Sequence, residues 1–151
     1  MEQLVVWTDE LSVGVQELDD QHKALIDMLN SLGEAIHSGR SRQVRVAIFN
    51  KLIEYTQVHF TAEEGMMHTA CYPRYEEHKK EHERLVAHVL QFREKLASGQ
   101  ALASTELLMF LRRWLTDHIM KADKAYEKHL RKAGAKRSWI QRHVLDKFWS
   151  R

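Results

Sequence analysis

Residues 48–66 read IFNKLIEYTQVHFTAEEGM, and this stretch decides the fold class. Apolar side chains recur along it at helical spacing, at Ile48, Leu52, Tyr55 and Met66. His59 and Glu63 occupy the same stripe, where further apolar residues would be expected. The pattern predicts a long amphipathic helix, over about 42–68, whose buried face carries polar groups.

Three further segments show the same helical period, at about residues 20–37, 75–97 and 103–130. The turn signals between and after the four segments are Ser38-Gly39, Ala70-Cys71-Tyr72-Pro73, Ala97-Ser98-Gly99-Gln100 and Ala133-Gly134. Asp19 and Asp20 suit the start of the first helix, and Ser104 or Thr105 suits the start of the last. Short connections between long helices favour antiparallel neighbours. The predicted fold is therefore all-α, an up-down-up-down four-helix bundle.

We expect residues 1–151 to form one domain with two appendages. Residues 1–18 are predicted to be an extended arm, anchored on the bundle (about 20–130) by apolar side chains: Trp7, Val13, Val15 and Leu18. Residues 131–151 form a basic extension, with a short amphipathic helix at about 137–149. Seven basic residues and one acidic residue give this extension a net charge of +6, which leaves −4 on residues 1–130. An acidic body with a short basic tail predicts no nucleic-acid partner.

The composition favours a reduced, cytoplasmic protein. The single cysteine, Cys71, excludes an intrachain disulfide bond. No apolar run has the length needed to span a bilayer, and the N-terminus lacks the basic and apolar regions of a signal peptide. We also expect a monomer.

The chain contains ten histidines, and five of them lie on core-facing stripes together with two carboxylates: His22, His59, Glu63, His78, His82, His118 and Asp123. A buried polar group without a partner costs about 1–3 kcal/mol, and a domain has only about 5–15 kcal/mol of stability. A shared partner must compensate for seven such groups. Imidazole and carboxylate ligands without thiolates suit iron, manganese, copper, nickel or zinc.

The spacings agree with a shared centre, with one exception. His59 and Glu63 are four residues apart, as are His78 and His82, so each pair points to one side of its helix. His118 and Asp123 are five apart, and both can face the core only on a wide stripe or across a π-bulge. The remaining histidines lie off the stripes and are predicted to have no metal role: His37, His68, His88, His129 and His143.

Seven ligands are too many for one ion and suit two ions bridged by the two carboxylates. Di-iron oxidases in helical bundles supply about four carboxylates and two Glu-x-x-His motifs. Here the only such motif is Glu34/His37, at a helix end. A site with two carboxylates and five neutral imidazoles should stabilise ferrous iron, so charge counting favours reversible oxygen binding over oxygen cleavage.

The chain resembles the hemerythrin family in its single-domain bacterial form. The resemblance covers about residues 4–130 and rests on motifs in the family's order: Val13-Gly14-Val15, Asp19-Asp20-Gln21-His22-Lys23, His59-Phe60-Thr61-Ala62-Glu63-Glu64, Met66-Met67, Tyr72-Pro73 with His78 and His82, Trp114-Leu115-Thr116-Asp117-His118-Ile119, and Asp123. It implies a non-haem di-iron centre that binds dioxygen. It also implies that His78, His82 and His118 hold one iron, that His22 and His59 hold the other, and that Glu63, Asp123 and an oxo or hydroxo group bridge them.

The resemblance implies that dioxygen binds to the two-histidine iron and is held there as hydroperoxide. Phe60, Trp114, Leu115 and Ile119 are expected to line a dry oxygen pocket, although all four also suit a plain core. Tyr126, one turn past Asp123, is a candidate hydrogen-bond donor to the ligands.

The expected function is an oxygen carrier, store or delivery protein and not an enzyme. Two alternatives stay open: a di-iron redox enzyme that scavenges peroxide or nitric oxide, and an oxygen or redox sensor that acts through a separate partner. Iron storage is disfavoured, since no carboxylate-rich entry path is evident. The basic extension is expected to cap the bundle, or else to dock on an oxygen-consuming acceptor protein or a membrane surface.

Overall fold

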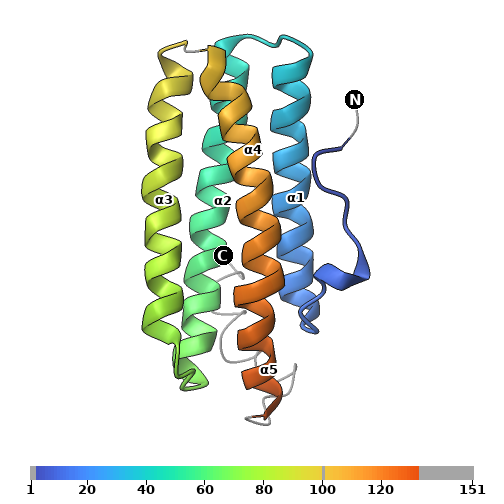
Figure 1. The fold of residues 1–151 in the computed structure, drawn as a ribbon, viewed down its shortest axis with the longest axis vertical. Coiled ribbons are helices and arrows are strands. Elements are labelled where there is room, and N and C mark those ends of the chain that lie inside the picture. The colour runs from blue at the N-terminus through green and yellow to red at the C-terminus, as the bar shows by residue number, and fades with distance from the viewer. Residues whose placement is uncertain (1–2, 100, 133–151) are drawn as a thin grey trace.

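The computed structural model describes residues 3–99 and 101–132, which form four long helices packed side by side (Figure 1). These are α1 (Gln16–His37), α2 (Arg42–Thr69), α3 (Tyr75–Ala97) and α4 (Ala101–Asp117). The last helix continues through the π-helix η2 (His118–Asp123) into α5 (Lys124–Lys132). Successive helices run in opposite directions, so the prediction of an all-α antiparallel bundle is confirmed. The predicted helix at 137–149 lies outside the described residues.

The helix α1 begins four residues before the predicted start, and Asp19 shows why. Val15 is the last extended residue, and the carboxylate of Asp19 lies inside the first turn. It accepts hydrogen bonds from Ser12 Oγ at 2.5 Å and from the amide of Val13 at 2.8 Å. Asp19 therefore fixes the end of the arm instead of capping the helix. The helix α4 likewise begins at Ala101, ahead of the predicted residue 103.

One end of the bundle is closed by two turns that contact each other. After α1, the amide of Arg40 donates to the carbonyl of Ala35 at 2.9 Å, across Gly39 with a φ of 67°. The turn after α3 contains Gly99, with a φ of 83°, beneath the guanidinium of Arg42. Arg42 also donates to the carbonyl of Ala97 at 3.3 Å, which ties the start of α2 to the end of α3.

The N-terminal arm runs along α1 (Figure 1). Asn30 of α1 pairs with the arm's backbone: its side-chain oxygen accepts from the amides of Leu4 and Val5, and its amide nitrogen donates to the carbonyl of Val5 at 2.9 Å. Trp7 is half-buried, and the Lys23 ammonium lies 4.9 Å from its ring centroid. The other predicted anchors are buried: Val13, Val15 and Leu18. The arm also contains the 3-10 turn η1 (Asp9–Leu11).

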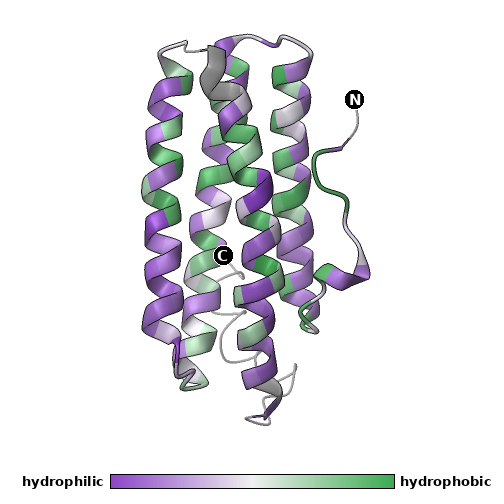
Figure 2. Cartoon of the chain, in the orientation of Figure 1, coloured by the Kyte–Doolittle hydropathy of each residue, from purple (hydrophilic) through white to green (hydrophobic). Residues whose placement is uncertain are grey.

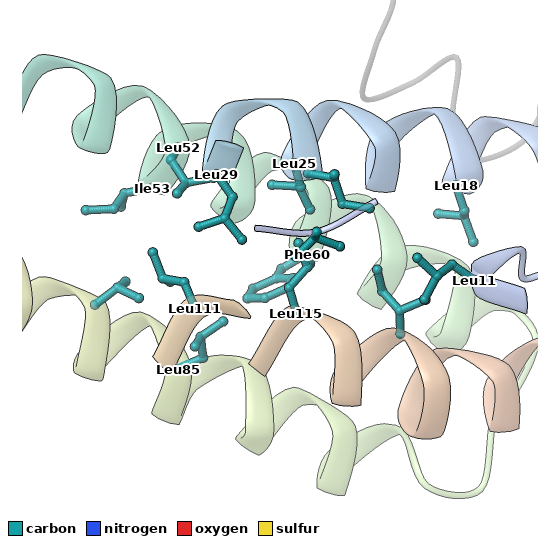
Figure 3. Packing of buried hydrophobic residues seen from close by; sticks show 14 of the residues in the cluster. Leu11, Leu18, Leu25, Leu29, Leu52, Ile53, Phe60, Leu85, Leu111 and Leu115 are labelled. Atoms are coloured by element: carbon teal, nitrogen blue, oxygen red, sulfur yellow. The ribbon is translucent and has the colours of Figure 1, made fainter. Parts of the chain in front are cut away.

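The apolar core lies along the bundle axis, and apolar side chains alternate with polar ones along every helix (Figure 2). Leu25, Leu29, Leu52, Leu85 and Leu111 meet in the interior (Figure 3). Leu11 and Leu18 form a second apolar group further along the axis (Figure 3). The buried His22 lies between Leu18 and Leu25 on α1, so a polar layer is enclosed by apolar layers on both sides.

Within the described ranges, no helix is both long enough and apolar enough to cross a membrane.

Candidate metal centre

All four long helical segments contribute to the polar layer. The side chains are His22 from α1, His59 and Glu63 from α2, His78 and His82 from α3, and His118 and Asp123 from η2. They form two groups in which the potential ligand atoms lie within 4.8 Å of one another: Glu63, His78, His82 and His118 in the first, and His22, His59 and Asp123 in the second. All seven are buried, with exposed fractions between 0% and 7%. The structure thus brings together all seven predicted ligands.

The π-helix brings His118 and Asp123 onto one face. Residues 118–123 form a π-helix between two regular α-helical segments. Its hydrogen bonds join residues five apart, so side chains at that spacing lie above one another. On a regular α-helix the same two side chains would point about 140° apart. We predicted that this pair needs either a wide stripe or a π-bulge, and the structure has the π-bulge.

The two carboxylates lie between the histidine groups. Asp123 places Oδ2 at 3.0 Å from His22 Nε2, and Oδ1 at 3.0 Å from His118 Nε2 and 3.3 Å from His78 Nε2. Glu63 places Oε2 at 3.5 Å from His59 Nε2 and 3.4 Å from His82 Nε2. Each carboxylate therefore faces imidazoles of both groups.

Many of these buried atoms have no hydrogen-bond partner, although they lie close together. All four carboxylate oxygens of Glu63 and Asp123, both ring nitrogens of His22, and Nε2 of His78 are unsatisfied. Leaving a buried polar atom unpaired costs about 1–3 kcal/mol. His82 Nε2 and His118 Nε2 also face each other at 3.1 Å, so two lone pairs would meet unless one nitrogen carried a proton or a cation lay between them. The donor set and its orphaned atoms fit two metal ions.

Without a metal, the layer must share protons instead. Burial lowers the pKa of His82, but the nearby carboxylate of Glu63 and the hydrogen bond with Glu64 outweigh burial and raise that pKa to about 9. Burial likewise opposes protonation of His118, yet Asp123 raises its pKa. Burial and the neighbouring His22 hold the pKa of His59 well below its usual value. His118 in turn holds the pKa of Asp123 well below its usual range, against the effect of burial, while burial and Asp123 raise the pKa of Glu63.

Two histidines of the polar layer also contact, through Nδ1, polar side chains to which the sequence patterns assigned no role. Gln21 Oε1 lies 2.5 Å from His59 Nδ1, and Glu64 Oε1 lies 2.9 Å from His82 Nδ1. Each contact orients its ring so that Nε2 faces the interior of the layer. In the sequence, the only feature that could have pointed to Gln21 and Glu64 is that each is adjacent to a predicted ligand, His22 or Glu63.

Tyr126 is fully buried, and its ring centroid lies 6.3 Å from that of His78. Its hydroxyl has no hydrogen-bond partner, and burial raises its pKa well above the usual value. Its expected part as a donor to the ligands therefore stays a prediction.

Two of the four predicted pocket residues pack against histidines of the polar layer, and the other two are buried. Phe60 is stacked on His82, with ring centroids 3.7 Å apart and an interplanar angle of 2°. Trp114 is stacked on His118, with centroids 5.2 Å apart and an angle of 21°. Leu115 and Ile119 are buried, and Leu115 borders a small apolar cavity of about 20 Å³ shared with Trp114. Phe60 and Leu115 point into the same part of the interior (Figure 3).

A separate, open groove of about 520 Å³ lies along α3 and α4. His78 and His118 form part of its wall, together with charged residues such as Glu81, Arg113 and Lys121. Two histidines of the polar layer thus border a space that a small molecule could enter.

The other described histidines lie outside both groups. The ring of His68 packs against Tyr75, that of His88 stacks on Phe92, and His129 Nε2 lies 3.1 Å from the carbonyl of Ala70. Neither these three nor His37 belong to either group, whereas His143 lies outside the described residues. Cys71 is a free, exposed thiol.

Comparison with known proteins gives one family. Residues 13–130 match the family described as the hemerythrin HHE cation binding domain. The chain is 36% identical over 126 residues to a bacteriohemerythrin of Stenotrophomonas maltophilia, covering 82% of this chain and 79% of that protein. It is 34% identical to a myohemerythrin of Sipunculus nudus, covering 81% of this chain and 90% of that protein. The crystal structure of a wild-type hemerythrin superposes with a TM-score of 0.77 at 35% identity, covering 84% of this chain and 98% of that one.

Proposed function

The chain belongs to the hemerythrin family, and from this membership we propose that it binds dioxygen reversibly at a non-haem di-iron centre. It would act as an oxygen carrier, store or delivery protein and not as an enzyme. The observation that carries the proposal is the enclosed polar layer, in which three histidines and two histidines face a pair of carboxylates. No other cluster of this kind exists among the described residues.

We assign the ligands by the two groups. His78, His82 and His118 would hold one iron, and His22 and His59 would hold the other. Glu63 and Asp123 would bridge the two, together with an oxo or hydroxo group. The positions of the carboxylates support this assignment, because each lies within 3.0–3.8 Å of imidazoles from both groups. One iron would then have one histidine fewer than the other, which leaves room for dioxygen.

When bound, the two irons supply the electrons that dioxygen takes up on binding and returns on release. The chain's own residues provide the surroundings for that exchange. Five imidazoles and two carboxylates bring only two negative charges, a balance that favours the ferrous state to which the centre must return. Phe60, Leu115 and Ile119 are buried, so they exclude water and the protons it would deliver.

The direct test is metal content, followed by spectra of the anaerobically reduced protein before and after exposure to air. We expect two irons per chain and a charge-transfer band in the near ultraviolet and visible range that disappears when oxygen is removed. Zinc or no metal, in protein produced with ample iron, would contradict the assignment of the seven ligands.

A second candidate, a di-iron redox enzyme that scavenges peroxide or nitric oxide, is favoured by the groove along α3 and α4. That groove gives a small molecule access to His78 and His118 without passing through the apolar pocket. Two irons that oxidise at once without a stable oxygenated form, together with turnover of peroxide or nitric oxide, would support this function over the carrier. A sensor that acts through a separate partner would, like the carrier, show no turnover of peroxide or nitric oxide.

A further inference from the structure

The two polar side chains behind the ligand histidines are chemically unequal. His59 of the two-histidine group is backed by the neutral amide of Gln21, and His82 of the three-histidine group by the carboxylate of Glu64. Gln21 is buried, and Glu64 is 21% exposed. His22, the second histidine beside His59, has no hydrogen-bond partner at Nδ1. Neither Gln21 nor Glu64 belongs to the proposed ligand set.

The two contacts reach their rings in the same way, although the Gln21 contact is shorter, at 2.5 Å against 2.9 Å for Glu64. Both reach the Nδ1 atom of an imidazole, and both leave Nε2 facing Glu63 Oε2, at 3.5 Å from His59 and 3.4 Å from His82. A carboxylate and an amide oxygen can only accept, so Nδ1 of each ring donates and Nε2 keeps its lone pair for a metal. The two rings therefore have the same donor atom and orientation, and the chemical difference between their acceptors is charge.

That charge changes the strength of the imidazole as a ligand. A hydrogen bond to an ionised acceptor is roughly twice as strong as one between neutral groups. It draws the Nδ1 proton away from the ring and so raises the electron density at Nε2, which makes the ring a more basic ligand. A more basic ligand stabilises ferric iron relative to ferrous iron. Partial exposure of Glu64 weakens this effect without removing it, because the hydrogen bond at 2.9 Å is formed.

We propose that Glu64 and Gln21 are positioning residues that make the two irons unequal: Glu64 favours the ferric state on the His82 side, and Gln21 keeps the His59 side easier to reduce. The inference rests on the proposed di-iron function. The amide behind His59 then favours return of the oxygen-binding side to the ferrous state, whereas a carboxylate there would favour oxidation.

The test exchanges the two side chains in the iron-loaded protein. Glu64→Gln and Gln21→Glu each keep a hydrogen-bond acceptor of similar size and change its charge. Glu54→Gln and Gln57→Glu make the same changes at exposed positions of α2 and serve as matched controls. The measurements are iron content, chelator competition, and the midpoint potentials of the two one-electron steps in a dithionite and ferricyanide titration.

We expect Glu64→Gln to raise the potential of one step and to weaken iron retention about tenfold, the lower end for loss of such a partner. We expect Gln21→Glu to lower the potential of the other step and to speed autoxidation severalfold. The controls should match the wild-type protein. Two irons with both potentials unchanged in Glu64→Gln would overturn the proposal, and so would equal shifts of both steps in either variant.

If Glu64→Gln loses an iron, Glu64→Asp decides the case. Recovery of that iron by the shorter carboxylate supports a role for the charge, and a loss in both variants overturns it. The result is separable from the proposed function. A wild-type protein that holds two irons without reversible oxygen binding would contradict the carrier function, while the potentials of the variants would still test Glu64 and Gln21.

Discussion

His118 occupies a point in the centre where two partners meet. Its Nε2 lies 3.0 Å from Asp123 Oδ1 and 3.1 Å from His82 Nε2. We expect His118→Ala to bind one iron fewer, or to lose the folded state, because the truncation removes one of the three histidines proposed to hold that iron and one of the imidazoles that neutralise Asp123. Metal analysis of the purified variant checks this. His88→Ala removes an exposed histidine from the neighbouring helix α3 and should keep two irons. A His118→Ala protein with two irons and normal oxygen spectra would refute the assignment.

Trp114 covers one side of His118 and lines the groove together with it. It is half-buried, stacks on His118 and contacts the edge of Phe60 at a centroid distance of 5.7 Å. We expect Trp114→Ala to speed autoxidation severalfold, because water and protons reach the centre more easily once the indole is gone. The decay of the oxygenated spectrum measures the rate. Trp7→Ala, on the arm, is the control and should leave it unchanged. An unchanged rate in Trp114→Ala would remove this residue from the pocket wall.

At the scale of single residues, the side chains of the polar layer could be predicted because each one interrupts an apolar stripe, and an interruption is visible in the sequence. Gln21 and Glu64 interrupt nothing, since each lies beside a stripe residue, where a polar side chain is ordinary. Their importance depends on which ring nitrogen lies within 3 Å, and only the folded arrangement of α1, α2 and α3 decides that.

Among the elements, the end of the arm that leads into α1 is held by the carboxylate of Asp19. Asp19 accepts two hydrogen bonds from residues 12 and 13, one of them from a backbone amide. We expect Asp19→Ala to lower the free energy of unfolding by about 1–3 kcal/mol, because these partly buried donors lose their acceptor. Denaturant unfolding measures the change. Asp20→Ala removes an exposed carboxylate next to it and should change stability by less than about 0.5 kcal/mol. Equal effects in the two variants would contradict this account of the arm.

The π-helix η2 gives a second prediction at this scale. Deleting the partly exposed Met120 would bring His118 and Asp123 to a spacing of four residues. On a regular α-helix such residues are about 40° and 6 Å apart, as His59 and Glu63 are, so both would still face the layer. We expect this deletion to keep two irons. Deleting the exposed Met109 from the regular helix α4 would instead rotate the preceding segment by about 100° against η2 and should abolish iron binding.

Metal analysis of both deletion variants makes the comparison. Loss of iron in the Met120 deletion would show that the π-turn itself sets the orientation of Asp123.

The helix bounds show where periodicity is less informative. Periodicity predicted every long helix, but the predicted start of α1 was four residues too late. The reason is that the Asp19 carboxylate can accept hydrogen bonds from the arm as well as from the amides at a helix start.

For the whole molecule, fold and centre are one structure. The apolar layers stabilise the bundle, and the bundle encloses a polar layer. Without cations, the groups of this layer repel one another or lack hydrogen-bond partners. The sequence could predict this arrangement because both the stripes and their interruptions are local patterns. It could not predict the groove along α3 and α4, whose volume depends on how closely two helices pack. The expected cap formed by residues 131–151 lies almost wholly outside the described residues and stays a prediction.

The metal-free protein should therefore depend on pH in a way that the loaded protein does not. In the folded apoprotein the pKa of His82 is raised from 6.5 to about 9. A raised pKa means that protonation stabilises the fold fully below pH 6.5, and that this stabilisation is lost as the pH rises through about 9. A shift of this size corresponds to about 3 kcal/mol. The pKa of His118 is also raised and adds to the loss.

We accordingly expect the free energy of unfolding of the apoprotein, measured in denaturant, to fall by about 3 kcal/mol between pH 6.5 and 9. The loaded protein should be flat over that window, because a bound ion keeps its ligand imidazoles neutral at every pH there. His82→Gln should remove most of the slope from the apoprotein, while His88→Ala should leave it intact. An apoprotein whose stability does not change, or rises, between those pH values would mean that protons do not replace the metal in this layer.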